Sequence, residues 1–123
     1  MRRAMMIAAA ACAVLVVGRA APALAGYGAF AVNPTTSKYG LTWDKRTLRE
    51  AEDQAMKDCG GSGCKIMFRT RGGQCTAIAK AQDSDKIGAA FRGSRDAASL
   101  ASVEDCQKQT KGQCKVAITQ CNH

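Results

Sequence analysis

The sequence predicts an α+β fold in which two similar halves form antiparallel sheet packed by two helices. The first observation is an internal repeat, because four positions in residues 26–73 recur in residues 74–123 at spacings of 47 to 50. The matching pairs are Ala31 with Ala79, Gly40 with Gly88, Cys59 with Cys106, and Cys64 with Cys114. The second observation is that each copy reads as strand, strand, helix, strand. Neither copy alone can bury both its sheet face and its helix, so the two are expected to pack into one domain. Whether they form one continuous sheet or two stays open.

A hairpin is expected at the start of the first copy. An alternating stretch ends at Val32, and Tyr39, Leu41 and Trp43 then share one face of the next stretch. Residues 33–37 between them read Asn-Pro-Thr-Thr-Ser, which is turn chemistry. A lone tryptophan in such an alternating strand is more often part of the core, so Trp43 is expected to be buried rather than to anchor a ligand.

The helix and third strand of the first copy follow. Thr47 and Glu50 form a capping box, which predicts a helix beginning near Leu48, and the glycines at 60 and 61 can end it. The apolar helix positions on one face are Leu48, Ala51, Ala55, Met56 and Cys59. The third strand alternates Cys64, Ile66 and Phe68 against Lys65, Met67, Arg69 and Arg71.

The second copy repeats these elements with weaker local signals. Ser94 is a plausible N-cap, but the helical stripe is diluted because Ser102 stands where the first copy has Ala55. The strand positions that repeat the alternation are Ile87, Ala89 and Phe91, and then Cys114, Val116 and Ile118.

Residues 1–25 have the layout of a secretory signal peptide. Arg2 and Arg3 precede an apolar run of about 15 residues, which is short of the roughly 20 needed to span a bilayer. The small residues Ala23 and Ala25 predict cleavage after Ala25. A lipoprotein site at Cys12 and a twin-arginine signal are alternatives, and ordinary export is favoured over both. The expected product is a single domain of residues 26–123, periplasmic or secreted, with no transmembrane segment.

Removing the signal leaves a basic domain with an even number of cysteines. The signal contains three arginines and no acidic residue, so the net charge falls from +8 to +5. Six cysteines remain, which is an even number, and the exported domain is expected to fold in an oxidising compartment. They therefore predict three disulfides. Symmetry of the repeat favours Cys59–Cys64 and Cys106–Cys114, which leaves Cys75–Cys121. A zinc site is the alternative, but the chain has no C-x-x-C pair and its one histidine is His123, so neither a metal nor a cofactor is expected.

The arrangement resembles a family of small exported bacterial proteins known as domain of unknown function 4189. The resemblance rests on the segments at residues 27–31, 39–40, 59–60, 64–66 and 75–79, and it covers nearly the whole domain. It implies export and a shared fold. The family has no established catalytic residues to transfer to this chain.

No catalytic arrangement is expected. A nucleophile needs a positioned base, and His123 is expected to lie exposed on a segment that frays. The glycines at 60, 61 and 63 follow a helix and lack a lysine, so they do not form a phosphate-binding loop. A hydrolase that uses two helix carboxylates remains an alternative. The acidic residues concerned are Glu50, Glu52, Asp53, Asp58, Asp96, Glu104 and Asp105.

The candidate binding face is a set of basic residues with one methionine. Its members are Lys65, Met67, Arg69, Arg71 and, from the second copy, Lys115. Such a face could contact anionic lipid headgroups, cell-wall polymers or an acidic protein. The simpler interpretation is a solvated sheet face whose charges discourage edge pairing. Nucleic acid is not an expected partner, because the chain is exported and carries no stacking motif.

The sequence therefore predicts an exported, non-catalytic binding module that engages a protein or an anionic envelope component. A second interpretation is an inhibitor or immunity protein against a secreted or periplasmic lytic enzyme. A small carboxylate-dependent hydrolase and an envelope protein without a specific ligand are the two interpretations that remain.

Overall fold

The computed structural model describes residues 26–123, and the predicted signal segment lies outside the described residues. The first half consists of β1 (Tyr27–Val32), β2 (Tyr39–Lys45), α1 (Leu48–Cys59) and β3 (Lys65–Thr70). The second half consists of β4 (Cys75–Ala81), β5 (Ile87–Arg92), α2 (Arg95–Gln107) and β6 (Cys114–Cys121). The strands form two antiparallel sheets of three strands each, in the orders β2-β1-β3 and β5-β4-β6. The predicted α+β fold class is confirmed, and the open question is answered in favour of two sheets.

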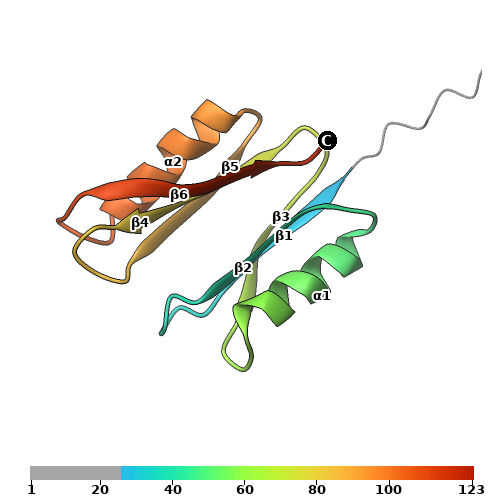
Figure 1. Cartoon of the computed structure of the whole chain (residues 1–123), viewed down its shortest axis with the longest axis horizontal. Coiled ribbons are helices and arrows are strands. Elements are labelled where there is room, and N and C mark those ends of the chain that lie inside the picture. The colour runs from blue at the N-terminus through green and yellow to red at the C-terminus, as the bar shows by residue number, and fades with distance from the viewer. Residues whose placement is uncertain (1–25) are drawn as a thin grey trace, which may run out of the picture.

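The two halves lie side by side with their helices on the outside (Figure 1). Each helix covers the outer face of its own sheet, and the inner faces of the two sheets meet. The β1–β2 and β4–β5 hairpin tips point toward the same end of the molecule. Residues 26 and 123 lie together at the other end, where the Gly26 amide donates to the His123 carbonyl at 3.1 Å. Within residues 26–123 neither helix is long and apolar enough to cross a membrane.

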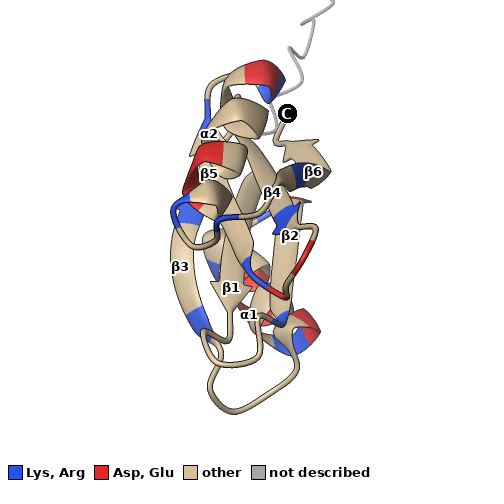
Figure 2. Cartoon of the chain, turned by 90° about the vertical axis from the view of Figure 1, so that its left-hand side faces the viewer, with Lys and Arg blue, Asp and Glu red and all other residues tan. Residues whose placement is uncertain are grey.

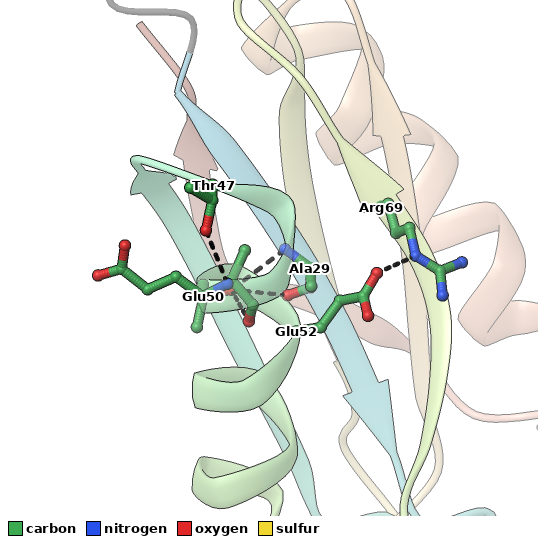
Figure 3. Close-up of polar contacts among 7 residues, drawn as sticks. Ala29, Thr47, Glu50, Glu52 and Arg69 are labelled. Carbon is green, nitrogen blue, oxygen red and sulfur yellow. Dashed lines mark hydrogen bonds and ion pairs between the residues drawn. The ribbon is translucent and has the colours of Figure 1, made fainter.

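α1 is capped at the predicted residues, but only one of the two hydrogen bonds of the predicted capping box forms, because the Glu50 carboxylate points away from Thr47 (Figure 3). The Thr47 hydroxyl oxygen accepts from the Glu50 amide at 3.1 Å, which satisfies one of the free amides of the first turn (Figure 3). Gly60 ends the helix with a φ of 93°, a left-handed conformation that glycine adopts without strain. In the second half the Ser94 hydroxyl accepts from the Ala97 amide in the same way.

The helix-facing sides of both sheets are lined by small residues. Beneath α1 the buried cluster consists of Ala29, Ala31, Ala51, Ala55, Cys59 and Cys64. Beneath α2 the buried residues are Cys75, Ala77, Ala79, Ala81, Ala98 and Cys106. Ser102 is also fully buried there, and its hydroxyl donates to the Ser99 carbonyl at 2.7 Å, so its burial leaves no unpaired hydroxyl. The serine that seemed to weaken the helical stripe is therefore a small, satisfied core residue.

Such small side chains allow each helix to lie against backbone near the start of the second strand of its half. A Cβ added to Gly40 would lie 2.8 Å from the Cys59 nitrogen and closer still to the Ala55 carbonyl oxygen. A Cβ added to Gly88 would lie 2.7 Å from the Cys106 Cα. The repeated glycine is thus required by a close helix-to-strand approach that both halves share.

The larger side chains lie between the two sheets. The Phe30 and Phe68 ring centroids are 5.1 Å apart, and those of Phe68 and Phe91 are 4.8 Å apart, at separations typical of aromatic pairs. Ile78 is fully buried at the centre of β4. Lys80 Nζ lies 5.7 Å from the centre of the Tyr39 ring, which joins β4 to β2.

A bulge in β2 explains why the burial predicted for Trp43 is wrong. Tyr27 pairs with Lys45 but Ala29 pairs with Thr42, so β2 holds one extra residue opposite β1 at this point. The alternation of faces is broken there, as at other bulges. Trp43 lies next to the bulge on an edge strand and is 37% exposed rather than buried in the core.

The three predicted disulfides are confirmed. Cys59–Cys64 and Cys106–Cys114 each join the end of a helix to the start of the following strand. Cys75–Cys121 joins directly paired residues of β4 and β6. Three disulfides in so short a domain are typical of proteins that fold outside the reducing cytoplasm.

Asn122 holds the two halves together through its side chain and backbone. It is 4% exposed, and its side-chain nitrogen donates to Thr70 Oγ1 at 2.7 Å and to the Arg71 carbonyl at 3.1 Å. Its side-chain oxygen accepts from the Asp44 amide at 2.9 Å. Its backbone amide donates to the Gln74 carbonyl at 2.9 Å.

The segment that contains Asn122 and His123 was expected to fray, and this prediction is wrong for its backbone. The His123 amide donates to Asp44 Oδ1 at 2.7 Å, and its carbonyl accepts from Gly26. The His123 side chain is 88% exposed, as expected.

Replacing Asn122 by alanine is expected to lower the free energy of unfolding by about 2–3 kcal/mol, because its buried partners lose their hydrogen bonds. Urea denaturation followed by the fluorescence of Trp43, the single tryptophan, measures the change. Gln107→Ala, at an exposed position, is the control and should change stability by less than about 0.5 kcal/mol. Equal effects of the two substitutions would show that Asn122 does not join the halves.

Candidate anion-binding surface

Positive charge is concentrated on the strands and loops rather than on the helices. Between residues 26 and 123, α1 and α2 carry seven acidic and three basic residues, whereas the strands and loops carry twelve basic and three acidic. Figure 2 shows the red segments chiefly on the two helices and the blue segments spread over strands and loops. The surface that could attract an anionic partner is therefore built by the strand ends and the loops.

A second bulge places the predicted basic residues of β3 on different faces. Phe30 pairs with Phe68 but Ala31 pairs with Ile66, so the intervening Met67 is an extra residue in β3. Ile66 packs against the alanine cluster beneath α1, whereas Phe68 packs between the sheets. The regular alternation expected for this strand is therefore wrong. The alternation expected for Cys114, Val116 and Ile118 is wrong as well, because Ile78 pairs with Ile118 but Ala79 pairs with Val116, so β6 also holds an extra residue, and Val116 is 40% exposed.

The structure accordingly divides the candidate binding face into three places. Lys65 and the 61% exposed Met67 lie at the hairpin end of β3. Lys115 lies on β6, which neighbours β2, while β3 neighbours β5 on the other side of the molecule. Arg69 and Arg71 lie at the far end of β3, where they line one cleft. Of the five residues of the candidate binding face, only Arg69 and Arg71 lie together.

The cleft gathers three arginines from the first half. Its volume is about 550 Å³, and its lining residues are Tyr27, Arg46, Thr47, Leu48, Arg69, Thr70 and Arg71. Tyr27 pairs with Lys45 and Gly28 pairs with Thr70, so β2 and β3 end at the same level on either side of β1. The arginine cleft, meaning the space bounded by Arg46, Arg69 and Arg71, follows from this register.

One carboxylate neutralises part of this charge. Glu52 on α1 forms an ion pair with Arg69 (Figure 3). The Asp44 carboxylate, two residues before Arg46, accepts from the His123 amide and lies 3.5 Å from His123 Nε2. The Arg46 and Arg71 side chains are exposed, so their guanidinium groups are open to a ligand.

A second cavity, of about 320 Å³, lies between the sheets at the hairpin end. Its lining combines apolar and charged side chains, among them Phe30, Phe68, Ile87, Lys86 and Asp105. The Asp105 carboxylate accepts from the Ala89 amide at 3.0 Å, so it satisfies backbone at the edge of β5. This contact blocks the addition of a further strand to β5.

Several of the other helix carboxylates lie beside neighbouring groups of the protein. Asp53 lies 3.9 Å from Arg49, and Asp58 accepts from Gln54 at 2.7 Å. Glu104 and Asp105 line a cavity of about 230 Å³, but Asp105 is the residue that accepts from Ala89. These contacts give several of the candidate acids a structural role.

Sequence reasoning missed Arg46 and Tyr27 as members of the cleft and Asn122 as a junction. Arg46 lies in the turn before α1, and Arg71 lies in the turn after β3. Only the pairing of β2 and β3 with β1 places these turns together. The repeat did contain a sequence signal for the cleft. The three arginines have no basic counterparts in the second copy, where the corresponding residues are Gly93, Thr119 and Cys121.

Comparison with known proteins identifies a family and a structural relative. The chain is similar to Rv1813c from Mycobacterium tuberculosis, solved by NMR, with 25% identity, a TM-score of 0.57 and 99% of each chain covered. No curated protein matches the sequence. The family described as domain of unknown function (DUF4189) matches residues 27–121. The chain therefore belongs to the DUF4189 family.

Proposed function

We propose that this protein is a non-catalytic binding module that acts outside the cytoplasm and engages an anionic component of the cell envelope. The signal peptide predicted at residues 1–25 directs its export, and the domain of residues 26–123 works in the periplasm or after secretion. The three disulfides support an oxidising location.

The observation that carries this proposal is the separation of charge. The helices have an excess of acidic residues, and the strands and loops have an excess of nine basic residues. A surface with one predominant sign attracts partners of the opposite sign and repels others. The helix faces then point away from an anionic partner while the strand ends and loops contact it.

Two substitution sets of equal charge test the proposal. One set replaces Arg46, Lys65 and Arg71 by glutamine, and the other replaces Arg49, Lys57 and Arg95 by glutamine. Each lowers the net charge by three, but the first set lies on strands and loops and the second on the helices. Binding to vesicles of phosphatidylglycerol and phosphatidylcholine is then measured at two salt concentrations.

The strand-and-loop set is expected to weaken vesicle binding on the order of 100-fold, since each basic residue near an anionic membrane contributes about 1 kcal/mol. The helix set is expected to weaken binding by less than about threefold, because its charges lie away from the partner and are screened. Binding of the natural chain should also fall as salt rises. Equal losses from the two sets would mean that net charge alone matters, and the proposal would be wrong. Binding to acidic protein but to no vesicle would also overturn it.

A further inference from the structure

We infer that the arginine cleft binds a phosphate ester. This inference rests on the proposed function and names the chemical group that this surface recognises. The cleft is built by the first half alone, from the turn before α1 and the end of β3. Its volume of about 550 Å³ is in the range of small-molecule sites and is far larger than one phosphate group needs. The cleft therefore has room for an organic part beside the phosphate.

The charge of the cleft matches a phosphate rather than a single carboxylate. Arg46, Arg69 and Arg71 bring three positive charges, and Glu52 offsets one of them through its ion pair with Arg69. The remaining charge of two matches a phosphate monoester, which carries about −1.5 to −2 at pH 7. Arginine suits this group because its planar guanidinium forms two parallel hydrogen bonds to neighbouring oxygens.

The organic part of the ligand has its own wall in the cleft. Tyr27 is half-buried against the alanine cluster beneath α1, and Leu48, also half-buried, lines the same cleft. A glycerol or sugar unit could lie against these side chains while its phosphate faces the guanidinium groups. The combination of an apolar wall and a few converging charged groups is typical of ligand sites.

Comparison of the two halves shows that the cleft is not a by-product of the fold. Tyr27 and Arg71 correspond, through the repeat, to Cys75 and Cys121 of the second half. There the same two positions are joined by a disulfide. The position of Arg46 is taken by Gly93 and that of Arg69 by Thr119. At this place the first half thus has an open cleft lined by three arginines, whereas the second half has a disulfide and Arg95, whose guanidinium donates to the Thr119 carbonyl at 3.1 Å.

The experiment measures binding of glycerol 3-phosphate, inorganic phosphate and succinate to the folded domain by calorimetry. Glycerol 3-phosphate is expected to bind at least about tenfold more tightly than succinate, a dicarboxylate of similar charge, and more tightly than inorganic phosphate. Vesicles that contain phosphatidic acid, whose headgroup is a phosphate monoester, then distinguish a lipid headgroup from a soluble ester when the natural chain is compared with Arg71→Lys. Binding to the ester but not to vesicles assigns the site to a soluble or polymeric phosphate ester. Binding to both shows that the ligands of the site include a lipid headgroup.

Two variants separate recognition of phosphate from attraction by charge. Arg71→Lys keeps the charge and is expected to weaken glycerol 3-phosphate binding on the order of tenfold, because the paired hydrogen bonds are lost. Lys65→Gln removes a charge outside the cleft and is expected to change binding by less than about threefold. If Arg71→Lys binds as the natural chain does, or if succinate binds equally well, the inference is wrong. The charge comparison under the proposed function would still stand in that case.

Discussion

Replacing Gly40 or Gly88 by alanine is expected to destabilise the domain by about 3 kcal/mol or more, because the added methyl group has no room. The new Cβ would lie 2.8 Å from the Cys59 nitrogen at the first position and 2.7 Å from the Cys106 Cα at the second. These neighbours are helix backbone, so a change of rotamer cannot relieve the overlap. The helix must move away from its sheet and break contacts with the buried alanines. Urea denaturation of each single variant measures the loss.

Gly93→Ala is the matched control for these two variants. Nothing lies within 4 Å of a Cβ built on Gly93, and its φ is not in the left-handed region. This substitution is expected to change the free energy of unfolding by less than about 1 kcal/mol. A similar loss at all three glycines would show that lost backbone freedom, rather than close approach of helix and strand, controls stability.

Removing the Cys75–Cys121 disulfide by replacing both cysteines with alanine is expected to cost about 4 kcal/mol, more than the loss of either short bridge. The two residues are separated by 46 positions, against 5 for Cys59–Cys64 and 8 for Cys106–Cys114. A disulfide that closes a longer loop restricts the unfolded chain more, so removing it returns more conformational entropy to the unfolded state. The short bridges are expected to contribute about 2 kcal/mol each on the same scale.

Thermal and urea denaturation of the three double-alanine variants tests this order. The variant without Cys75–Cys121 should also exchange the amides of β6 faster, since this strand pairs only with β4. A smaller loss for this variant than for the one without Cys59–Cys64 would contradict the expectation.

Much of the fold could be predicted because the repeat made each half a check on the other. The doubled cysteine pattern led to the correct disulfides, and Thr47 and Ser94 marked the starts of the helices. The repeated glycine was visible in the sequence at positions 40 and 88, but its physical reason was not. The close approach depends on how deeply the helix packs, which only the three-dimensional structure shows.

The surface was harder to predict because the bulges in β2 and β3 change which side chains share a face. The extra residue in β2 places Trp43 at an exposed edge, and the extra residue at Met67 separates Lys65 from Arg69. Strand periodicity assumes a regular ladder, and neither bulge is marked by a glycine or proline at its own position. The arginine cleft depends on the pairing of β2 and β3 with β1, which connects turns 25 residues apart in the sequence.

The most direct test of the account is a titration of the folded domain with glycerol 3-phosphate, followed residue by residue through amide chemical shifts. We expect saturable shifts at residues 46–48 and 69–71 and at Tyr27, which bound the arginine cleft. The corresponding positions 93–95 and 119–121 of the second half are an internal control and should not shift. Shifts of equal size in both halves, or no saturable shift at the cleft, would contradict the account.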